Sequence, residues 1–217
     1  MHNRHMERSA AYSGILGAVV FAASGVIPGA FPDARSSSST LAAYLAGHHV
    51  PMLLSAWLAL PAAAFILWFA YGLFDYLREP DGGDRTLLQW GAAGAAIWAA
   101  LLVASSALQA GITINPGTDL ATLYVIDVIL FVFAMGAFAM FAFTAANAAR
   151  RTGALPGWLN ALGYLVFVVD LLFTLTIFSA GGALSITGFG VIIAPALSAL
   201  WVLVASFVLL VSVPKTL

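Results

Sequence analysis

Two aspartates lie inside long apolar stretches of this sequence, where an ionisable side chain is unusual. Asp127 follows "LATLYVI", and Asp170 is the eighth residue of "GYLVFVVDLLFTLTIF". A carboxyl group in the middle of a membrane costs ~2.5 to 3.5 kcal/mol on insertion scales, so such residues commonly mark a proton, ion or ligand pathway. Asp127 and Asp170 are therefore the main candidates for chemistry.

Neither aspartate has a basic residue nearby along the chain. No Lys or Arg occurs between Arg85 and Arg150, or between Arg151 and Lys215. A buried salt bridge within one chain is therefore not expected, and both burial and mutual repulsion oppose two charges in one place. We expect at least one carboxyl group to be protonated and to donate a hydrogen bond. The alternative is a site that holds a cation or water.

Other polar side chains are expected in the same outer half of the molecule. They are Gln109 with Ser105 one turn away, Tyr124, Thr174, and the adjacent pair His48 and His49. Together they would line an outward-facing polar cavity that binds or moves a proton, a cation or a small molecule. The alternative is that each Asp only bonds to a neighbouring hydroxyl or backbone group.

A metal site made of His48, His49, Asp127 and Asp170 is the most specific form of this hypothesis, because imidazole and carboxylate groups bind zinc or copper. Adjacent helical residues point about 100° apart, and the histidines begin roughly 10 Å above the aspartates, so both rarely reach one ion. We therefore assign no metal and leave the cofactor unknown. No hydrolase, zinc-protease, P-loop or dinucleotide-binding motif appears in a convincing sequence context.

The elements that must position these residues are apolar segments of membrane-spanning length. The 217 residues are 62% hydrophobic and only 8% charged, a composition far from that of soluble domains. A span needs about 20 apolar residues. Six segments qualify, approximately at residues 10–30, 50–77, 87–112, 119–149, 156–181 and 184–213.

The predicted spans place the two aspartates at similar depth. At 1.5 Å per residue, Asp127 lies roughly 10 Å and Asp170 roughly 13 Å below the outer boundary. The short turns between the spans make consecutive helices antiparallel neighbours. We therefore expect the two carboxyl groups to share one site.

The basic residues indicate the orientation. Seven of them lie in the N-terminal tail, the second and fourth loops and the C-terminal tail, which all face the same side of the membrane if the spans alternate in direction. Only Arg35 lies on the other side. The seven are Arg4, Arg8, Arg78, Arg85, Arg150, Arg151 and Lys215. Short loops rich in Lys and Arg stay in the cytoplasm. Both termini are predicted to be cytoplasmic, with the first span kept as a signal anchor in the cell (inner or plasma) membrane.

Small residues in the third span predict close helix packing. Gly91, Ala95 and Ala99 form one ladder, and Ala92, Ala96 and Ala100 form the next. In lipid, helices associate through such small residues and through interhelical hydrogen bonds. The segment 87–112 is therefore predicted to be the central helix, packed on more than one side.

The stretch "RRTGALPGWLNALGYL" and the first outer loop "STLAAYLAGHH" resemble a family of small bacterial membrane proteins that is common in actinobacteria and has no assigned function. The likeness covers most of the chain as a layout of six spans, a long first outer loop and a basic inner turn. It implies a helical bundle in the inner membrane and no catalytic residue.

The sequence thus predicts an all-α, single-domain, six-helix membrane bundle with three candidate functions. The first is binding or moving a proton, cation or small molecule at Asp127 and Asp170. The second is a non-catalytic subunit of a membrane complex, and the third is a metal-dependent membrane enzyme. The partners expected are the lipid bilayer and a second copy or another membrane subunit. A net charge of −1 without a basic block argues against nucleic acid.

Overall fold

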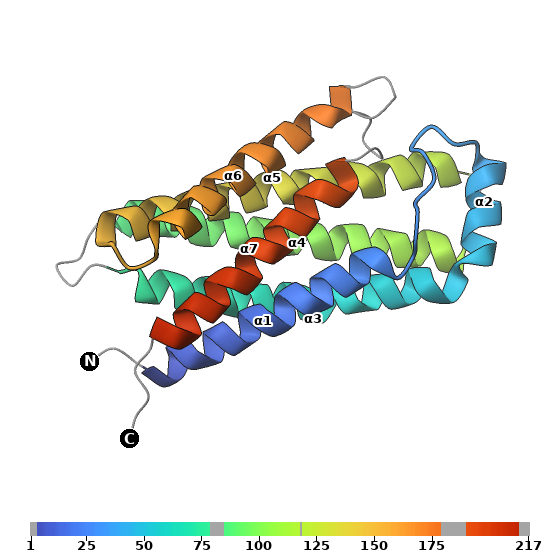
Figure 1. The fold of residues 1–217 in the computed structure, drawn as a ribbon. Helices are drawn as coiled ribbons and strands as arrows, with labels where there is room; N and C mark the ends of the chain where they lie inside the picture. The colour runs from blue at the N-terminus through green and yellow to red at the C-terminus, as the bar shows by residue number, and fades with distance from the viewer. Residues whose placement is uncertain (1–3, 79–84, 118, 179–189, 213–217) are drawn as a thin grey trace.

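The protein is a bundle of long antiparallel helices (Figure 1). The structure, a computed structural model, describes residues 4–78, 85–117, 119–178 and 190–212. Its helices are α1 (Arg4–Val26), α2 (Ser38–Gly47), α3 (His49–Tyr76), α4 (Arg85–Ile114), α5 (Leu120–Thr152), α6 (Gly157–Thr174), the 3₁₀ turn η1 (Leu175–Phe178) and α7 (Gly190–Ser212). No strand occurs in these described ranges.

Six helices are long and apolar enough to cross a membrane, which confirms the predicted all-α, six-span organisation. They correspond in order to the six predicted segments, with α6 ending at Thr174 and continuing only as η1. The predicted residues 179–181, 184–189 and 213 lie outside the described part of the chain. Six helices of spanning length therefore match the predicted segments, although several of their boundaries differ.

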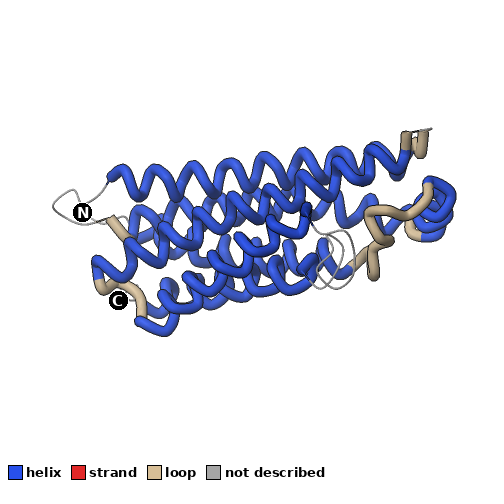
Figure 2. The backbone as a smooth tube through the Cα atoms, turned by 90° about the horizontal axis from the view of Figure 1, so that it is seen from above, coloured by secondary structure: helices blue, strands red, loops and turns tan. Residues whose placement is uncertain are grey.

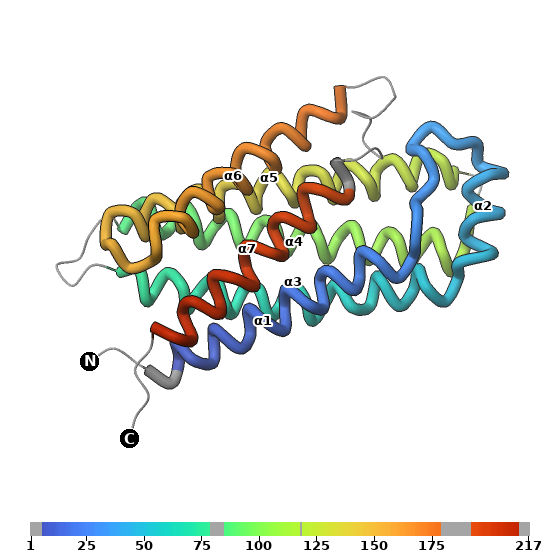
Figure 3. Tube along the Cα trace, viewed as in Figure 1, coloured from blue at the N-terminus to red at the C-terminus, as the bar shows by residue number. Residues whose placement is uncertain are grey.

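The short helix α2 was not predicted, because ten residues of mixed polarity carry no membrane-span signal. It begins after Ser37, whose hydroxyl accepts a hydrogen bond from the Thr40 backbone N–H at 3.3 Å. This side-chain bond is the usual N-terminal cap of a helix. α2 lies across the bundle axis at the end opposite the first residue of α1 and the last residue of α7 (Figure 3). We call residues 27–47 the cap. The end of the bundle that carries the cap is the cap end, and the opposite end, where α1 begins and α7 ends, is the terminal end.

The six long helices form a closed ring. In spatial order α1 packs on α3, α3 on α4, α4 on α5, α5 on α6, α6 on α7, and α7 returns to α1. Seen from above, the helices run side by side along one axis (Figure 2). α5 is the most buried of the six, so the third span is not the central helix that was predicted. The third span, α4, does pack on two sides, against α3 and α5, as predicted.

Aromatic rings fill the middle of this ring. Trp98, Phe138, Phe141 and Trp201 are each at most 1% exposed. Their rings meet edge to face, with centroids 5.6 Å apart for Trp98 and Phe138, 5.3 Å for Phe138 and Phe141, and 5.4 Å for Phe141 and Trp201. Edge-to-face contacts are the favoured geometry of aromatic pairs. The centre of the bundle is thus a packed aromatic core.

Glycines permit the closest helix contacts. A Cβ atom at Gly94 would lie 3.0 Å from the backbone oxygen of Ala137 and 3.0 Å from the backbone nitrogen of Phe141. The predicted ladder of Gly91, Ala95 and Ala99 is buried, as expected. The second ladder of Ala92, Ala96 and Ala100 is exposed, because α4 packs mainly on α3 and α5.

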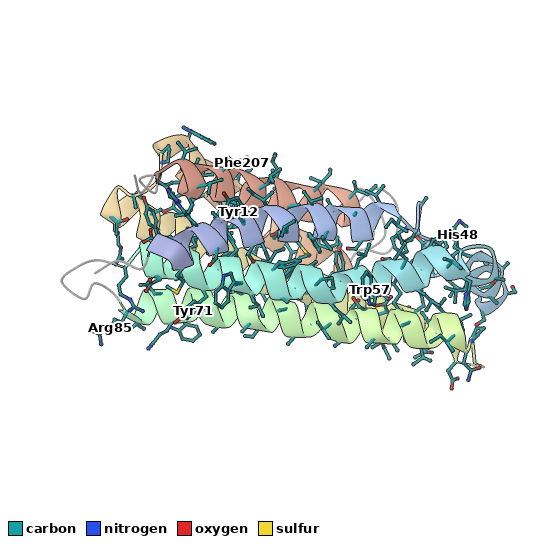
Figure 4. All side chains as sticks on the ribbon, turned by 90° about the horizontal axis from the view of Figure 1, so that it is seen from below. Tyr12, His48, Trp57, Tyr71, Arg85 and Phe207 are labelled. Atoms are coloured by element: carbon teal, nitrogen blue, oxygen red, sulfur yellow. The ribbon has the colours of Figure 1, made fainter. Side chains whose placement is uncertain are left out.

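Large apolar side chains also cover the outside of the bundle. Trp57, Tyr71 and Phe207 are half exposed or more and project outward along its length (Figure 4). Tyr12 and Tyr71 lie toward the terminal end with Arg85, while His48 marks the cap end. A soluble protein rarely exposes such a surface, whereas lipid covers it without cost.

Candidate functional site

Asp127 joins α5 to α4 through one serine. The Ser105 hydroxyl donates to Asp127 Oδ1 at 2.5 Å and lies 3.3 Å from the backbone oxygen of the same residue. Asp127 is 7% exposed and Ser105 is 5% exposed. Because Ser105 faces α5 from the buried side of α4, the pair acts as an interhelical hydrogen bond.

Gln109, one turn along α4 from Ser105, bonds to a different helix. Its Nε2 donates to the backbone oxygen of Met52 on α3 at 3.0 Å. The Thr113 hydroxyl donates to the backbone oxygen of Gln109 at 2.6 Å, within α4 itself. Ser105, Gln109 and Asp127 are therefore buried as a group. Their hydrogen bonds connect α4 to two different neighbours and do not converge on one point.

Tyr124 of α5 attaches the cap to the bundle, whereas Tyr44 makes a hydrogen bond within the cap. The Tyr124 hydroxyl donates to the backbone oxygen of Pro32 at 2.9 Å, and the Tyr44 hydroxyl donates to the backbone oxygen of Pro28 at 2.9 Å. Burial raises the pKa of Tyr44 above its ordinary value, so this hydroxyl keeps its proton. His48 stacks on Tyr44 with ring centroids 4.2 Å apart. Tyr124 and His48 thus hold the cap in place.

Replacing Tyr124 with Phe is expected to loosen the cap without unfolding the bundle. Losing one hydrogen bond costs about 1 kcal/mol, or roughly a fivefold change in a local opening equilibrium. Trypsin cleavage after Arg35, an exposed residue of the cap, should accelerate by about that factor. Tyr12→Phe, at a 56% exposed position, is the control. An unchanged cleavage rate in the Tyr124 variant would contradict this role.

Asp170 joins α6 to α7. The Ser198 hydroxyl donates to Asp170 Oδ2 at 2.8 Å. The Asp170 side chain is 0% exposed, and its Oδ1 has no hydrogen-bond partner among the described residues. No described basic side chain pairs with Asp170 or Asp127. Asp170 is therefore a fully buried carboxyl group. One of its oxygens accepts a hydrogen bond, and the other has no hydrogen-bond partner among the described residues.

The two carboxyl groups lie at different depths, so the predicted shared site is not formed. A Cβ atom at Gly136 would lie 2.9 Å from Thr174 Cγ2, and one at Gly163 would lie 2.9 Å from Ala146 Cβ. These contacts set the register of α6 on α5 and place Asp170 level with about residue 140 of α5. Asp127 is then about 13 residues, or roughly 19 Å, closer to the cap end.

The error in the prediction has a simple cause. It assumed that the fifth span ends level with the start of the fourth. α5 has 33 residues, more than the about 20 needed to cross a membrane. Its segment before Gly136 extends past Thr174, the last residue of α6, and α2 packs against α5 there. Asp127 therefore belongs to the cap end, and Asp170 to the middle of the bundle.

None of the remaining predicted residues bonds to Asp170 in the described part of the chain. Thr174 donates its hydroxyl to the backbone oxygen of Leu171 at 2.6 Å. His49 is exposed at the first turn of α3, and the His48 Nδ1 lies 3.0 Å from the Tyr44 backbone oxygen. In the part of the chain that the structure describes, no three His, Asp or Glu side chains gather closely enough to hold a metal ion.

Sequence reasoning missed the hydrogen-bond partner of Asp170 and two further buried polar side chains of α6 and α7. Ser198 is its hydrogen-bond donor, and the buried side chains of Asn160 and Trp201 lie on the same pair of helices. The available signal was a hydroxyl residue inside the apolar segment "PALSALW". That signal is weak, because serine is common in membrane helices and often bonds to its own backbone.

Comparison with protein-family models, curated proteins and solved structures found no match to this chain. The resemblance to the actinobacterial membrane family therefore stays a prediction.

Proposed function

We propose that this protein is an integral membrane protein that takes up and releases a proton at Asp170. The observation that supports this most directly is the carboxyl group of Asp170, which is fully buried, bonded on one oxygen by Ser198 and open on the other. The count of basic residues further supports a cell-membrane protein with its terminal end in the cytoplasm.

The energetics favour a proton site over a permanent charge. An ionised carboxylate at mid-membrane costs ~2.5 to 3.5 kcal/mol or more unless it is paired. Asp170 has a hydroxyl donor but no cationic partner among the described residues. The neutral acid is therefore the resting form, and proton release is the costly step that water or a transient base must assist.

A larger ligand has less support at this position. Metal cations such as Ca²⁺ take about six to eight oxygen ligands, whereas Ser198 is the one described side chain that bonds to Asp170. Small molecules need pockets of about 300 Å³ or more, and the level of Asp170 is occupied by the aromatic core around Phe138, Phe141 and Trp201. A proton site needs neither a shell of oxygen ligands nor a pocket of that volume.

Replacing Asp170 with Asn tests this function, because Asn fills the same space and cannot release a proton. In liposomes that contain the purified protein and a trapped pH-sensitive dye, wild-type protein should conduct protons when a membrane potential is applied. The variant should lose about nine-tenths or more of that flux. Infrared difference spectra recorded as pH is changed should also lose the carboxylic-acid carbonyl band that Asp170 contributes, and Asp127→Asn should leave that band in place.

Asp127→Asn is the matched control, because Asp127 is also buried and also bonded by one serine hydroxyl. It should retain the flux, since its carboxyl lies at the cap end. Equal flux in wild-type and Asp170→Asn liposomes, or no wild-type flux above that of protein-free liposomes, would refute the proposal.

A non-catalytic subunit of a membrane complex is the second candidate. The exposed alanines of α4, Ala92, Ala96 and Ala100, favour it, because small residues let a partner helix approach closely. Ala96→Leu would then reduce co-purification of partner subunits while leaving the isolated protein folded. Absence of proton flux combined with that loss would favour this candidate over the first.

A further inference from the structure

Three exposed arginines lie at the terminal end of α4 and α5. They are Arg85, the first residue of α4, and Arg150 and Arg151, in the last turn of α5. A Cβ atom at Gly91 would lie 2.7 Å from Thr144 Cγ2, which sets the register of α4 on α5. Arg85 is six residues from Gly91 toward the terminal end. Arg150 is six residues from Thr144 in the same direction, so the two arginines lie at one height on neighbouring helices. We call Arg85, Arg150 and Arg151 the basic corner.

Acidic side chains in the described part of the chain leave the charge of this corner uncompensated. Neither Arg85 nor Arg150 makes an ion pair or a hydrogen bond with a described residue. Arg78, in contrast, lies 3.8 Å from Asp75. The sequence contains no Asp or Glu from residue 128 to residue 169, a stretch that includes the turn from α5 to α6. The basic corner is therefore complementary to an anionic partner.

The surface next to the basic corner is apolar and aromatic. Phe133, Met140 and Arg151 lie on one face of α5, because they are seven and eleven residues apart. Phe133 is 47% exposed and Met140 is 38% exposed. Trp90 on α4 and Trp158 at the start of α6 are each 59% exposed. Tryptophan is enriched at the height of the lipid headgroups, so this end of the bundle presents positive charge above an apolar face.

We propose that the basic corner binds the headgroup of an anionic phospholipid whose acyl chains lie along the exposed face of α5. Guanidinium groups bind phosphate through paired N–H donors, and the apolar face below them favours an amphiphile over a soluble anion. Each arginine near an anionic lipid surface strengthens association about fivefold. The corner lies about ten residues of α5, or roughly 15 Å, closer to the terminal end than Asp170. The inference is therefore independent of proton transfer.

Lipid titration followed by native mass spectrometry tests this surface. The purified protein in detergent micelles would be titrated with phosphatidylglycerol, which is anionic, and separately with phosphatidylcholine that carries the same acyl chains. The wild-type protein should bind the first phosphatidylglycerol about tenfold or more tightly than phosphatidylcholine. Equal affinities for the two lipids would overturn the proposal.

Substitutions in the basic corner locate the site. Three acidic residues precede Arg85 in the sequence, namely Glu79, Asp81 and Asp84. Arg150→Gln is therefore the primary variant, and it should weaken phosphatidylglycerol binding about fivefold. Arg85→Gln combined with Arg150→Gln should weaken it by up to about 25-fold, whereas Arg150→Lys should retain most of the affinity. Arg35→Gln is the matched control, because it removes the same charge from an exposed position at the cap end. An equal loss in Arg35→Gln would overturn the proposal, since net charge alone would then explain the binding.

Glycerol 3-phosphate, which has the phosphate but no acyl chains, distinguishes a lipid from a soluble anion. In molar excess it should leave phosphatidylglycerol bound, and displacement of the lipid would overturn the proposal in favour of a soluble-anion site. Asp170→Asn should leave the lipid affinity unchanged, which separates this surface from the proposed proton site. Circular dichroism checks the fold of each variant. If the double variant does not fold, Arg150→Gln and the wild-type comparison of the two lipids still decide.

Discussion

Replacing Phe141 with Ala is expected to lower the free energy of unfolding by about 3 to 5 kcal/mol, the usual cost of truncating a large buried aromatic side chain. Phe141 is 0% exposed. Its ring meets those of Phe74, Phe138 and Trp201 with centroids 5.6, 5.3 and 5.4 Å away. Because these partners come from α3, α5 and α7, the cavity would weaken contacts between three helices at once.

Phe133→Ala is the control for this substitution. Phe133 is also on α5, but it is 47% exposed, so lipid or detergent replaces most of its lost contacts. Its loss of stability should stay below about 1 kcal/mol. Reversible unfolding in mixed micelles, followed by tryptophan fluorescence, measures both variants. Similar losses for Phe133 and Phe141 would show that the aromatic core does not dominate stability.

Replacing Gly94 with Leu is expected to prevent α4 from docking on α5, and Gly94→Ala should cost about 1 to 3 kcal/mol of stability through overpacking. The added Cβ would meet the backbone oxygen of Ala137 and the backbone nitrogen of Phe141 at 3.0 Å each. Backbone atoms cannot rotate out of the way, so the two helices would have to separate. Gel filtration and thermal unfolding in detergent would report the loss of folded protein.

Gly111 on the same helix offers an opposite expectation. No atom lies within 4 Å of a Cβ built there. Alanine is about 1 kcal/mol better than glycine inside a helix, so Gly111→Ala should be neutral or slightly stabilising. The two Gly→Ala variants are thus expected to differ in sign. A stable Gly94→Ala protein would mean that α4 and α5 approach less closely than the structure places them.

These magnitudes separate the structural role of the carboxyl groups from a functional one. Interhelical hydrogen bonds in membranes average about 0.6 kcal/mol by double-mutant cycles. The bonds of Ser105 to Asp127 and of Ser198 to Asp170 therefore contribute little compared with the aromatic core. An insertion cost of ~2.5 to 3.5 kcal/mol for Asp170 exceeds that contribution, which is the physical argument for a role beyond packing.

The amino-acid sequence by itself determined the class of molecule. Long apolar segments must form helices in lipid because only helices satisfy their own backbone hydrogen bonds. The six spans and the presence of buried carboxyl groups at Asp127 and Asp170 followed from that rule, and both carboxyl groups are buried in the structure. The first ladder of small residues in α4 was likewise predictable from its four-residue spacing.

Only the tertiary structure decided which groups meet. Helical periodicity tells which residues share a face, but it does not tell which face of another helix they contact or at what height. The height of α6 along α5 was set by close contacts at two glycines, Gly163 against Ala146 and Gly136 against Thr174. These slide Asp170 away from Asp127 and bring it to Ser198. α7 also closes the ring onto α1, a pairing between the two ends of the chain that no turn length could indicate.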